Sequence, residues 1–144
     1  MKKWMLAVVL VAGCAHKAPP PVEEPAITSL YDRLGGKEAI SAVVDVFMTK
    51  VRADKRINRY FWNTNAPELR TLLIEQICNA SGGPCMYSGR DMKTAHAGMN
   101  IKDGEFGALV EDLIGALDQF KVPPREKGEL LSLLGPTKPD IVGQ

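Results

Sequence analysis

Residues 35–51 read GGKEAISAVVDVFMTKV, and their large apolar side chains recur every three or four positions. This spacing puts those side chains on one face of a helix, so the stretch predicts a long amphipathic helix that buries one face. No run of the chain alternates with a period of two for long enough to predict a strand, so helices set the fold class. The apolar face consists of Ile40, Val43, Val44, Phe47, Met48 and Val51.

Three further segments carry the same helical period. One begins at Pro67, because proline is tolerated in the first helical turn, and ends before Gly82-Gly83-Pro84. A second is expected to begin at the N-cap Asp103 and to be broken by Pro123-Pro124, which start a third that Gly135-Pro136 stops. Their apolar stripes are Leu69, Leu72, Leu73 and Ile77, then Phe106, Leu109, Val110, Leu113, Ile114, Leu117 and Phe120, and finally Leu130, Leu131, Leu133 and Leu134.

Two shorter segments complete the domain. Residues 29–34 predict a capped helical turn, and residues 86–101 predict a loop with at most one or two helical turns, since Gly89 and Gly98 interrupt a weak period. The class is therefore all-α, with about four main helices.

Composition excludes several classes of function. The chain has 144 residues, 45% of them hydrophobic, which is enough for one domain. Its 18 basic residues balance 17 acidic ones, so it lacks the positive excess that holds a phosphate backbone, and we expect no nucleic-acid partner. Three cysteines and two histidines argue against a four-ligand structural zinc site.

The first residues resemble an export signal. Two lysines precede the apolar run WMLAVVLVA (residues 4–12), and Val11-Ala12-Gly13-Cys14 resembles the bacterial lipobox, in which cleavage precedes an acylated cysteine. A plain signal peptide with a chance cysteine is the alternative. By resemblance to Gram-negative lipoproteins, Ala15 favours the outer membrane, facing the periplasm. We expect a signal peptide over 1–13, a lipidated Cys14 and proline-rich tether over 14–28, and a folded domain over 29–144 that is anchored rather than spanning.

The predicted loop holds the one histidine of that domain, His96, among soft apolar side chains. A lone histidine is often an ordinary core or surface residue. Haem, however, needs one strong axial nitrogen and a large apolar slot between helices, and this chain offers one imidazole and an excess of apolar helix face for its size.

Six motifs together resemble the group I truncated haemoglobins, at that family's spacing. They are SLYDRLGGKEAI (29–40), VDVF (44–47), YF (60–61), GGP (82–84), YSG (87–89) and MKTAH (92–96). The resemblance covers residues 29–134. It implies a two-over-two helical sandwich, haem b bound without covalent attachment, and His96 as the proximal iron ligand.

The resemblance also implies roles for other side chains. His96 would bind iron through Nε2, and its other nitrogen should donate to a carbonyl of the same loop. Arg90 and Lys93 could pair with the haem propionates, although both could equally be solvated loop charges. Apolar side chains would line the slot, where ordinary core packing is the alternative for each: Phe47, Met48, Phe61, Leu69, Leu73, Ile77, Met92, Met99, Ile101, Phe106 and Val110.

The distal side departs from the family. Met48 stands where the family usually has tyrosine, and Leu69 and Leu73 stand where a polar group is often found. Loss of a hydrogen bond to bound oxygen predicts weak oxygen discrimination. Gln76 is the nearest polar candidate, with Tyr60 and Trp62 as weaker ones. A thioether can also be an axial ligand, but soft packing beside the haem is the simpler role for a methionine here.

If Cys14 is acylated, Cys78 and Cys85 remain as a pair in an oxidising compartment. We expect them to form a disulfide that clamps the segment leading to His96; two free thiols or a redox-active pair are the alternatives. No Cys-x-x-Cys-His motif for covalent haem occurs.

Three functions follow from these patterns. The first is a haem protein that reversibly binds oxygen, carbon monoxide or nitric oxide. The second is a haem enzyme or redox protein of the same fold, such as a nitric oxide dioxygenase or a peroxidase, with an unidentified electron donor. The third is a domain that has lost haem and serves as an interaction module.

Overall fold

The computed structural model describes residues 28–144. The predicted signal peptide, the lipobox with Cys14, and the tether up to residue 27 lie outside the described residues. Within the described part, no helix is long and apolar enough to cross a membrane.

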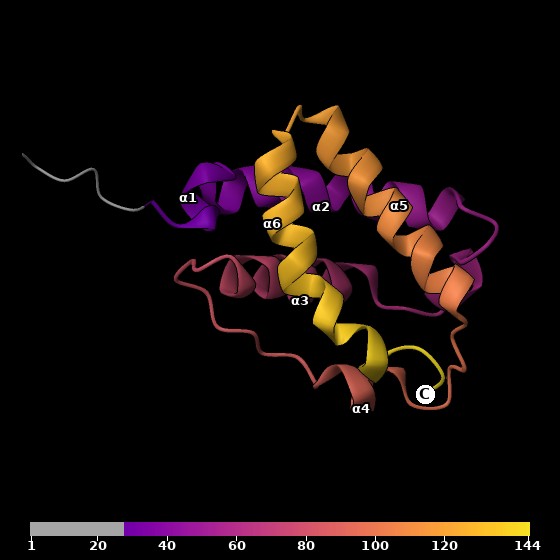
Figure 1. Ribbon diagram of the computed structural model, residues 1–144. Coiled ribbons are helices and arrows are strands. Elements are labelled where there is room, and N and C mark those ends of the chain that lie inside the picture. The colour runs from indigo at the N-terminus through magenta and orange to yellow at the C-terminus, as the bar shows by residue number, and fades with distance from the viewer. Residues whose placement is uncertain (1–27) are drawn as a thin grey trace, which may run out of the picture.

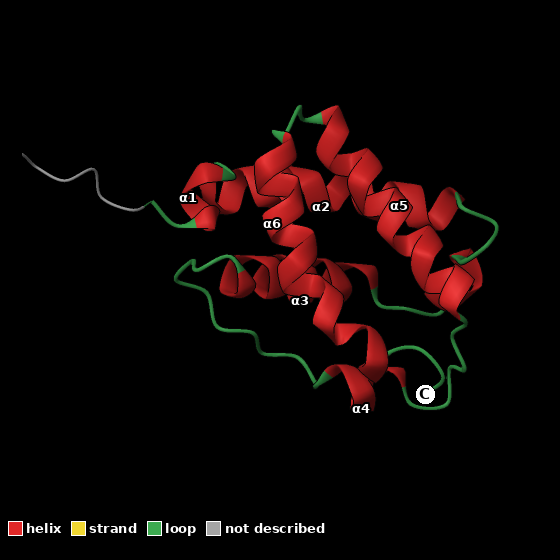
Figure 2. Ribbon diagram, viewed as in Figure 1, coloured by secondary structure: helices red, strands yellow, loops and turns green. Residues whose placement is uncertain are grey.

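The described chain is helical almost throughout, as predicted (Figure 2). The described residues form no strand, and their one β-type pairing is an isolated bridge between Ile101 and Val142. The elements are α1 (Leu30–Arg33), α2 (Gly36–Ala53), η1 (Asn58–Phe61), α3 (Ala66–Ala80), α4 (Met92–His96), α5 (Asp103–Gln119), α6 (Pro124–Leu134) and η2 (Gly135–Asp140).

Local sequence sets most helix ends. Ser29 and Asp32 form a capping box at α1, and the left-handed Gly35 (φ 95°) lets the chain turn directly into α2. Asn65 caps α3 by accepting a hydrogen bond from the Glu68 N–H, with Pro67 in the first turn as expected.

Two predicted ends are wrong. The N-cap of α5 is Lys102 rather than Asp103, because Glu105 turns back to accept the Lys102 N–H at 2.8 Å. That helix ends at Gln119, so Phe120 lies past its end and is 45% exposed. The predicted end of the next helix is confirmed, since α6 ends at Leu134, directly before Gly135-Pro136; the chain continues as the 3-10 helix η2, whose first turn has no need of the proline N–H.

The helices form a two-over-two sandwich. Helix α2 packs against α3 and α5, while α6 packs against α3 and α1; Figure 1 shows α5 and α6 lying across α2 and α3. All six apolar residues of the predicted α2 face are buried. Val44, Cys78, Leu117 and Leu130, from four different helices, are at most 1% exposed, so the core sits where the two layers cross.

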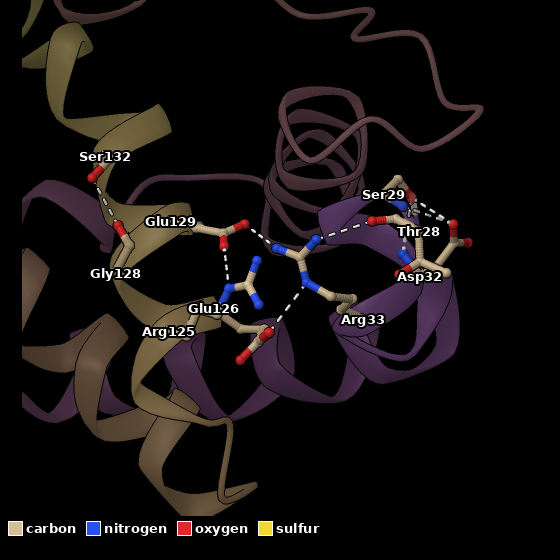
Figure 3. Close-up of polar contacts among 9 residues, drawn as sticks. All are labelled: Thr28, Ser29, Asp32, Arg33, Arg125, Glu126, Gly128, Glu129 and Ser132. Carbon is tan, nitrogen blue, oxygen red and sulfur yellow. Dashed lines mark hydrogen bonds and ion pairs between the residues drawn. The ribbon is translucent and has the colours of Figure 1, made fainter. Parts of the chain in front are cut away.

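A charge network ties α6 to the start of the domain (Figure 3). The Arg33 guanidinium donates from Nε to Glu126 Oε1 at 3.1 Å, from Nη1 to the Thr28 carbonyl at 3.0 Å, and also pairs with Glu129. Glu129 in turn accepts from Arg125 at 3.0 Å. Because Glu126 is only 8% exposed, its charge needs this partner, which lies 93 residues earlier in the chain.

Candidate functional site

Helix α4 is the short helix that carries His96. Asp91 Oδ1 caps it by accepting the Thr94 N–H at 2.9 Å, and this hydrogen bonding lowers the pKa of the Asp91 carboxyl. The helix ends at His96, and Gly98 (φ 80°) turns the chain away. A five-residue helix is too short to be stable alone, so its neighbours must hold it.

The His96 ring is oriented from within α4. Its Nδ1 lies 2.7 Å from the Met92 carbonyl oxygen. Since a carbonyl can only accept, Nδ1 must carry a proton and donate, so in the neutral ring the lone pair is on Nε2. The ring is half-buried. This is the carbonyl partner expected from the sequence, and it presents Nε2 as a metal-ligand nitrogen.

The predicted apolar wall divides into two groups: side chains in or against the main core cluster, and side chains outside it. Phe47, Met48 and Ile77 belong to the buried core, and Phe61, Leu69 and Leu73 are half-buried against it. Ile101 is buried outside this cluster. The others are half-buried apolar side chains that lie outside the core: Met92, Met99, Phe106 and Val110.

The second group tests whether haem fits. Met92 and Met99 flank His96 in the chain and, like Phe106 and Val110, are only half-buried, so part of their apolar area is in contact with water, which burial against a flat apolar ligand would remove. A single imidazole is the protein ligand that haem iron takes in globins. In the described residues, no cluster of histidine, cysteine and carboxylate side chains could hold a bare metal ion. The residues therefore fit haem.

A cavity of about 520 Å³ opens between α3 and the loop before α4. Its size is in the range of small-ligand pockets. Arg90 is on its wall, so the predicted propionate partner faces a cavity, whereas His96 is not among the lining residues and Lys93 is exposed on α4. The lining consists of Glu68, Thr71, Leu72, Ser88, Gly89 and Arg90.

The polar candidates for the distal side are engaged elsewhere. The Gln76 amide donates to the Met92 sulfur at 3.6 Å, so it bridges α3 to α4. The Tyr60 hydroxyl donates to Glu105 at 2.7 Å, and Trp62 is 73% exposed. Met48 is 9% exposed within the core, which favours packing as its role.

The segment leading to α4 is fastened to α3 at three points. Cys78 and Cys85 form the expected disulfide, with their Cα atoms 5.7 Å apart. The side chain of Asn79, the residue after Cys78, donates to the Cys85 carbonyl at 3.0 Å. Glu75 accepts from both the backbone N–H (3.0 Å) and the hydroxyl (2.6 Å) of Ser88, which lowers the pKa of Glu75.

Sequence reasoning missed the Glu75–Ser88 anchor, because Glu75 lies outside the apolar stripe of its helix and the YSG motif gave no partner for Ser88. It also missed Leu72 and Thr71 as cavity walls. Nothing in the sequence indicated that the loop before α4 would fold back over the side of α3 that carries Thr71 and Leu72.

Four main helices in two crossed layers are the architecture of a truncated globin. The chain belongs to the bacterial-like globin family, whose family model matches residues 29–142.

Relatives of known class agree. The chain is 38% identical over 118 residues to the group 1 truncated hemoglobin GlbN of Mycolicibacterium paratuberculosis, covering 82% of this chain and 85% of that protein. It is 34% identical over 116 residues to the group 1 truncated hemoglobin of Tetrahymena thermophila, covering 81% and 96%.

Solved structures extend the likeness to the fold. The truncated hemoglobin of Tetrahymena pyriformis in its Fe(III) form superposes with a TM-score of 0.78 at 32% identity, covering 81% of this chain and all of that one. The 2/2 hemoglobin of Synechococcus, solved in the cyanomet state with covalently attached heme, gives a TM-score of 0.75 at 30% identity, covering 80% and 98%.

Replacing Cys85 by alanine should lower the free energy of unfolding by about 2.5 kcal/mol, because the lost bridge closes a short loop in the unfolded chain. Urea unfolding followed by circular dichroism measures this difference. Under a strong reductant the wild-type and the variant should become equally stable; a difference that persists under reduction would mean that the bridge is not its source.

Proposed function

We propose that this protein binds haem b noncovalently through His96 and reversibly binds a small diatomic gas. The observation that carries the proposal is the His96 ring, whose Nδ1 is hydrogen-bonded to the Met92 carbonyl, which leaves Nε2 as the ring nitrogen for a ligand bond. The truncated globin family, to which the chain belongs, binds haem and gases.

Haem iron supplies the coordination position at which a gas binds, and the chain's residues define that position's surroundings. The hydrogen bond from His96 Nδ1 to Met92 fixes the ring plane and strengthens Nε2 as a ligand. Phe61, Leu69 and Leu73 would exclude water from the gas-binding side. Arg90, at the wall of the cavity beside α3, would pair with a haem propionate.

The proposed distal side selects among gases because it lacks a free hydrogen-bond donor within the described part of the chain. The polar candidates donate elsewhere, Gln76 to Met92 and Tyr60 to Glu105. Bound oxygen gains more from a hydrogen-bond donor than carbon monoxide does, so this pocket should retain oxygen poorly. Peroxidase-type chemistry needs an acid–base group on that side, and this is why we propose reversible binding in preference to an enzyme.

Replacing His96 by glycine should abolish tight haem binding, because the iron loses its only strong protein ligand. Haemin titration followed by the Soret band measures the affinity, and added imidazole should restore the wild-type spectrum by occupying the vacated position. Lys93→Ala, in the same helix, is the matched control and should keep the axial spectrum. Unchanged affinity and spectrum in the glycine variant would contradict the axial assignment.

Replacing Met48 by tyrosine should slow oxygen dissociation roughly 10- to 150-fold, because a phenol in the distal pocket adds a hydrogen bond worth about 1.5–3 kcal/mol. Stopped-flow displacement of oxygen by carbon monoxide measures the rate. Met48→Phe supplies the same ring without the hydroxyl and should leave the rate near that of the wild type. Equal rates in the two variants would show that this position does not face the gas.

The proposal includes a location: export, removal of residues 1–13, and acylation of Cys14, with the domain on the periplasmic side of the outer membrane. The lipobox-like sequence supports it, as does the Cys78–Cys85 disulfide, which suits an oxidising compartment. Cys14→Ala should move the protein from the membrane to the soluble fraction and abolish labelling by a fatty-acid analogue. A wild-type protein that remains unlabelled would exclude the anchor.

A further inference from the structure

The connection that leaves His96 has an uncommon backbone. Between α4 and α5 the chain passes through two left-handed residues, Gly98 (φ 80°) and Asn100 (φ 49°). Asparagine adopts this region more readily than most residues, but a positive φ is still uncommon for any residue with a side chain. Only one backbone hydrogen bond ties the turn to the helix itself, from the Met99 N–H to the His96 carbonyl at 3.1 Å. The turn therefore depends on other elements for its shape.

Those contacts come from the C-terminal segment, residues 138–144. The Asn100 N–H donates to the Gln144 carbonyl oxygen at 2.6 Å, and the Gly143 N–H donates to the Ile101 carbonyl at 2.9 Å. Together with the bridge between Ile101 and Val142, these bonds pair the two stretches side by side. Figure 1 shows the chain end returning beside α4 and the connection that follows it.

Apolar burial reinforces the pairing. Ile101 is 8% exposed and Ile141 is 7% exposed, although neither belongs to the main core cluster. They are buried at the junction between the C-terminal segment and the connection after α4, as a small satellite of the core. Removing either side chain should loosen this junction without emptying the crossing point of the four helices.

Lys138 adds a contact to the expected haem wall. Its Nζ lies 2.5 Å from Asp103 Oδ1, at the start of α5, and 5.7 Å from the centre of the Phe106 ring. Helix η2, which carries Lys138, also packs against α4. The C-terminal segment thus contacts α4, the connection after it and the first turn of α5.

We propose that residues 138–144 are the positioning element of His96, holding the end of α4 so that Nε2 keeps one orientation toward the iron. This inference rests on the proposed function for the iron, but the restraint on α4 exists with or without haem. The α3 anchors at Cys85, Ser88 and Met92 hold the approach to α4 and its first residue. The C-terminal segment holds its exit, so the two sets of contacts together leave the short helix little freedom.

The test compares two identical substitutions at different places. Ile141→Ala removes the satellite contact, and Ile40→Ala removes a side chain of equal size, 3% exposed, from the main core. In the haem-free protein, amide hydrogen exchange at Ala95 and Met99, divided by exchange at Val44 in α2, reports local opening of α4 against global opening. We expect this ratio to rise about tenfold in Ile141→Ala and not to rise in Ile40→Ala.

The haem-loaded protein gives a second readout. The iron–histidine stretching band in resonance Raman spectra should shift or broaden in Ile141→Ala and stay unchanged in Ile40→Ala. An unchanged exchange ratio together with an unchanged band in Ile141→Ala would overturn the proposal. If the wild-type protein fails to bind haem, the proposed function fails, while the exchange ratio still decides whether the C-terminal segment restrains α4.

A side-chain variant at the surface guards against loss of the fold. Should circular dichroism show that Ile141→Ala is unfolded, Lys138→Ala replaces it, because that change removes the contacts to Asp103 and Phe106 alone. Its control is Lys127→Ala, which breaks a comparable lysine–carboxylate pair with Asp118 between α5 and α6. The same ratio and the same band are measured, with the same expected difference between variant and control.

Discussion

The hydrogen bond from His96 Nδ1 to the Met92 carbonyl is the contact on which the proposed site depends. It fixes the tautomer, because a carbonyl accepts and never donates, and it thereby frees Nε2 for a metal. The hydrogen bond joins the first and last residues of α4, so its geometry is kept only while α4 stays helical. Any motion that unwinds this turn would release the ring. The orientation of the ring therefore depends on the contacts that keep α4 folded.

A five-residue helix cannot supply that stability, and the protein supplies it from both sides. Upstream, the Cys78–Cys85 disulfide and the Glu75–Ser88 contacts fasten the chain to α3. Downstream, the pairing of Ile101 with Val142 joins the chain to the C-terminal segment. The functional histidine is thus carried by the least regular part of a helical protein, and two well-anchored regions limit its motion.

The same contacts shape the distal side. The Gln76 amide is a candidate donor to a bound gas, but it donates to the Met92 sulfur instead and so links α3 to α4. Tyr60 likewise secures η1 to α5 through Glu105. In the proposed site this leaves Met48, Leu69 and Leu73 as the distal side chains, so the proposed gas selectivity would follow from the use of Gln76 and Tyr60 elsewhere.

The helical class, the buried face of α2, the pairing of Cys78 with Cys85 and the carbonyl partner of His96 could all be predicted from the sequence. Each depends on residues close together in the chain, where helical period or a short loop limits the geometry. The exchange of Asp103 for Lys102 as N-cap, the Arg33–Glu126 pair, the partner of Gln76 and the clasp of Ile101 by residues 141–144 could not. These contacts join residues whose meeting depends on how helices cross, or on which of several rotamers the surrounding side chains permit, and only tertiary packing decides that.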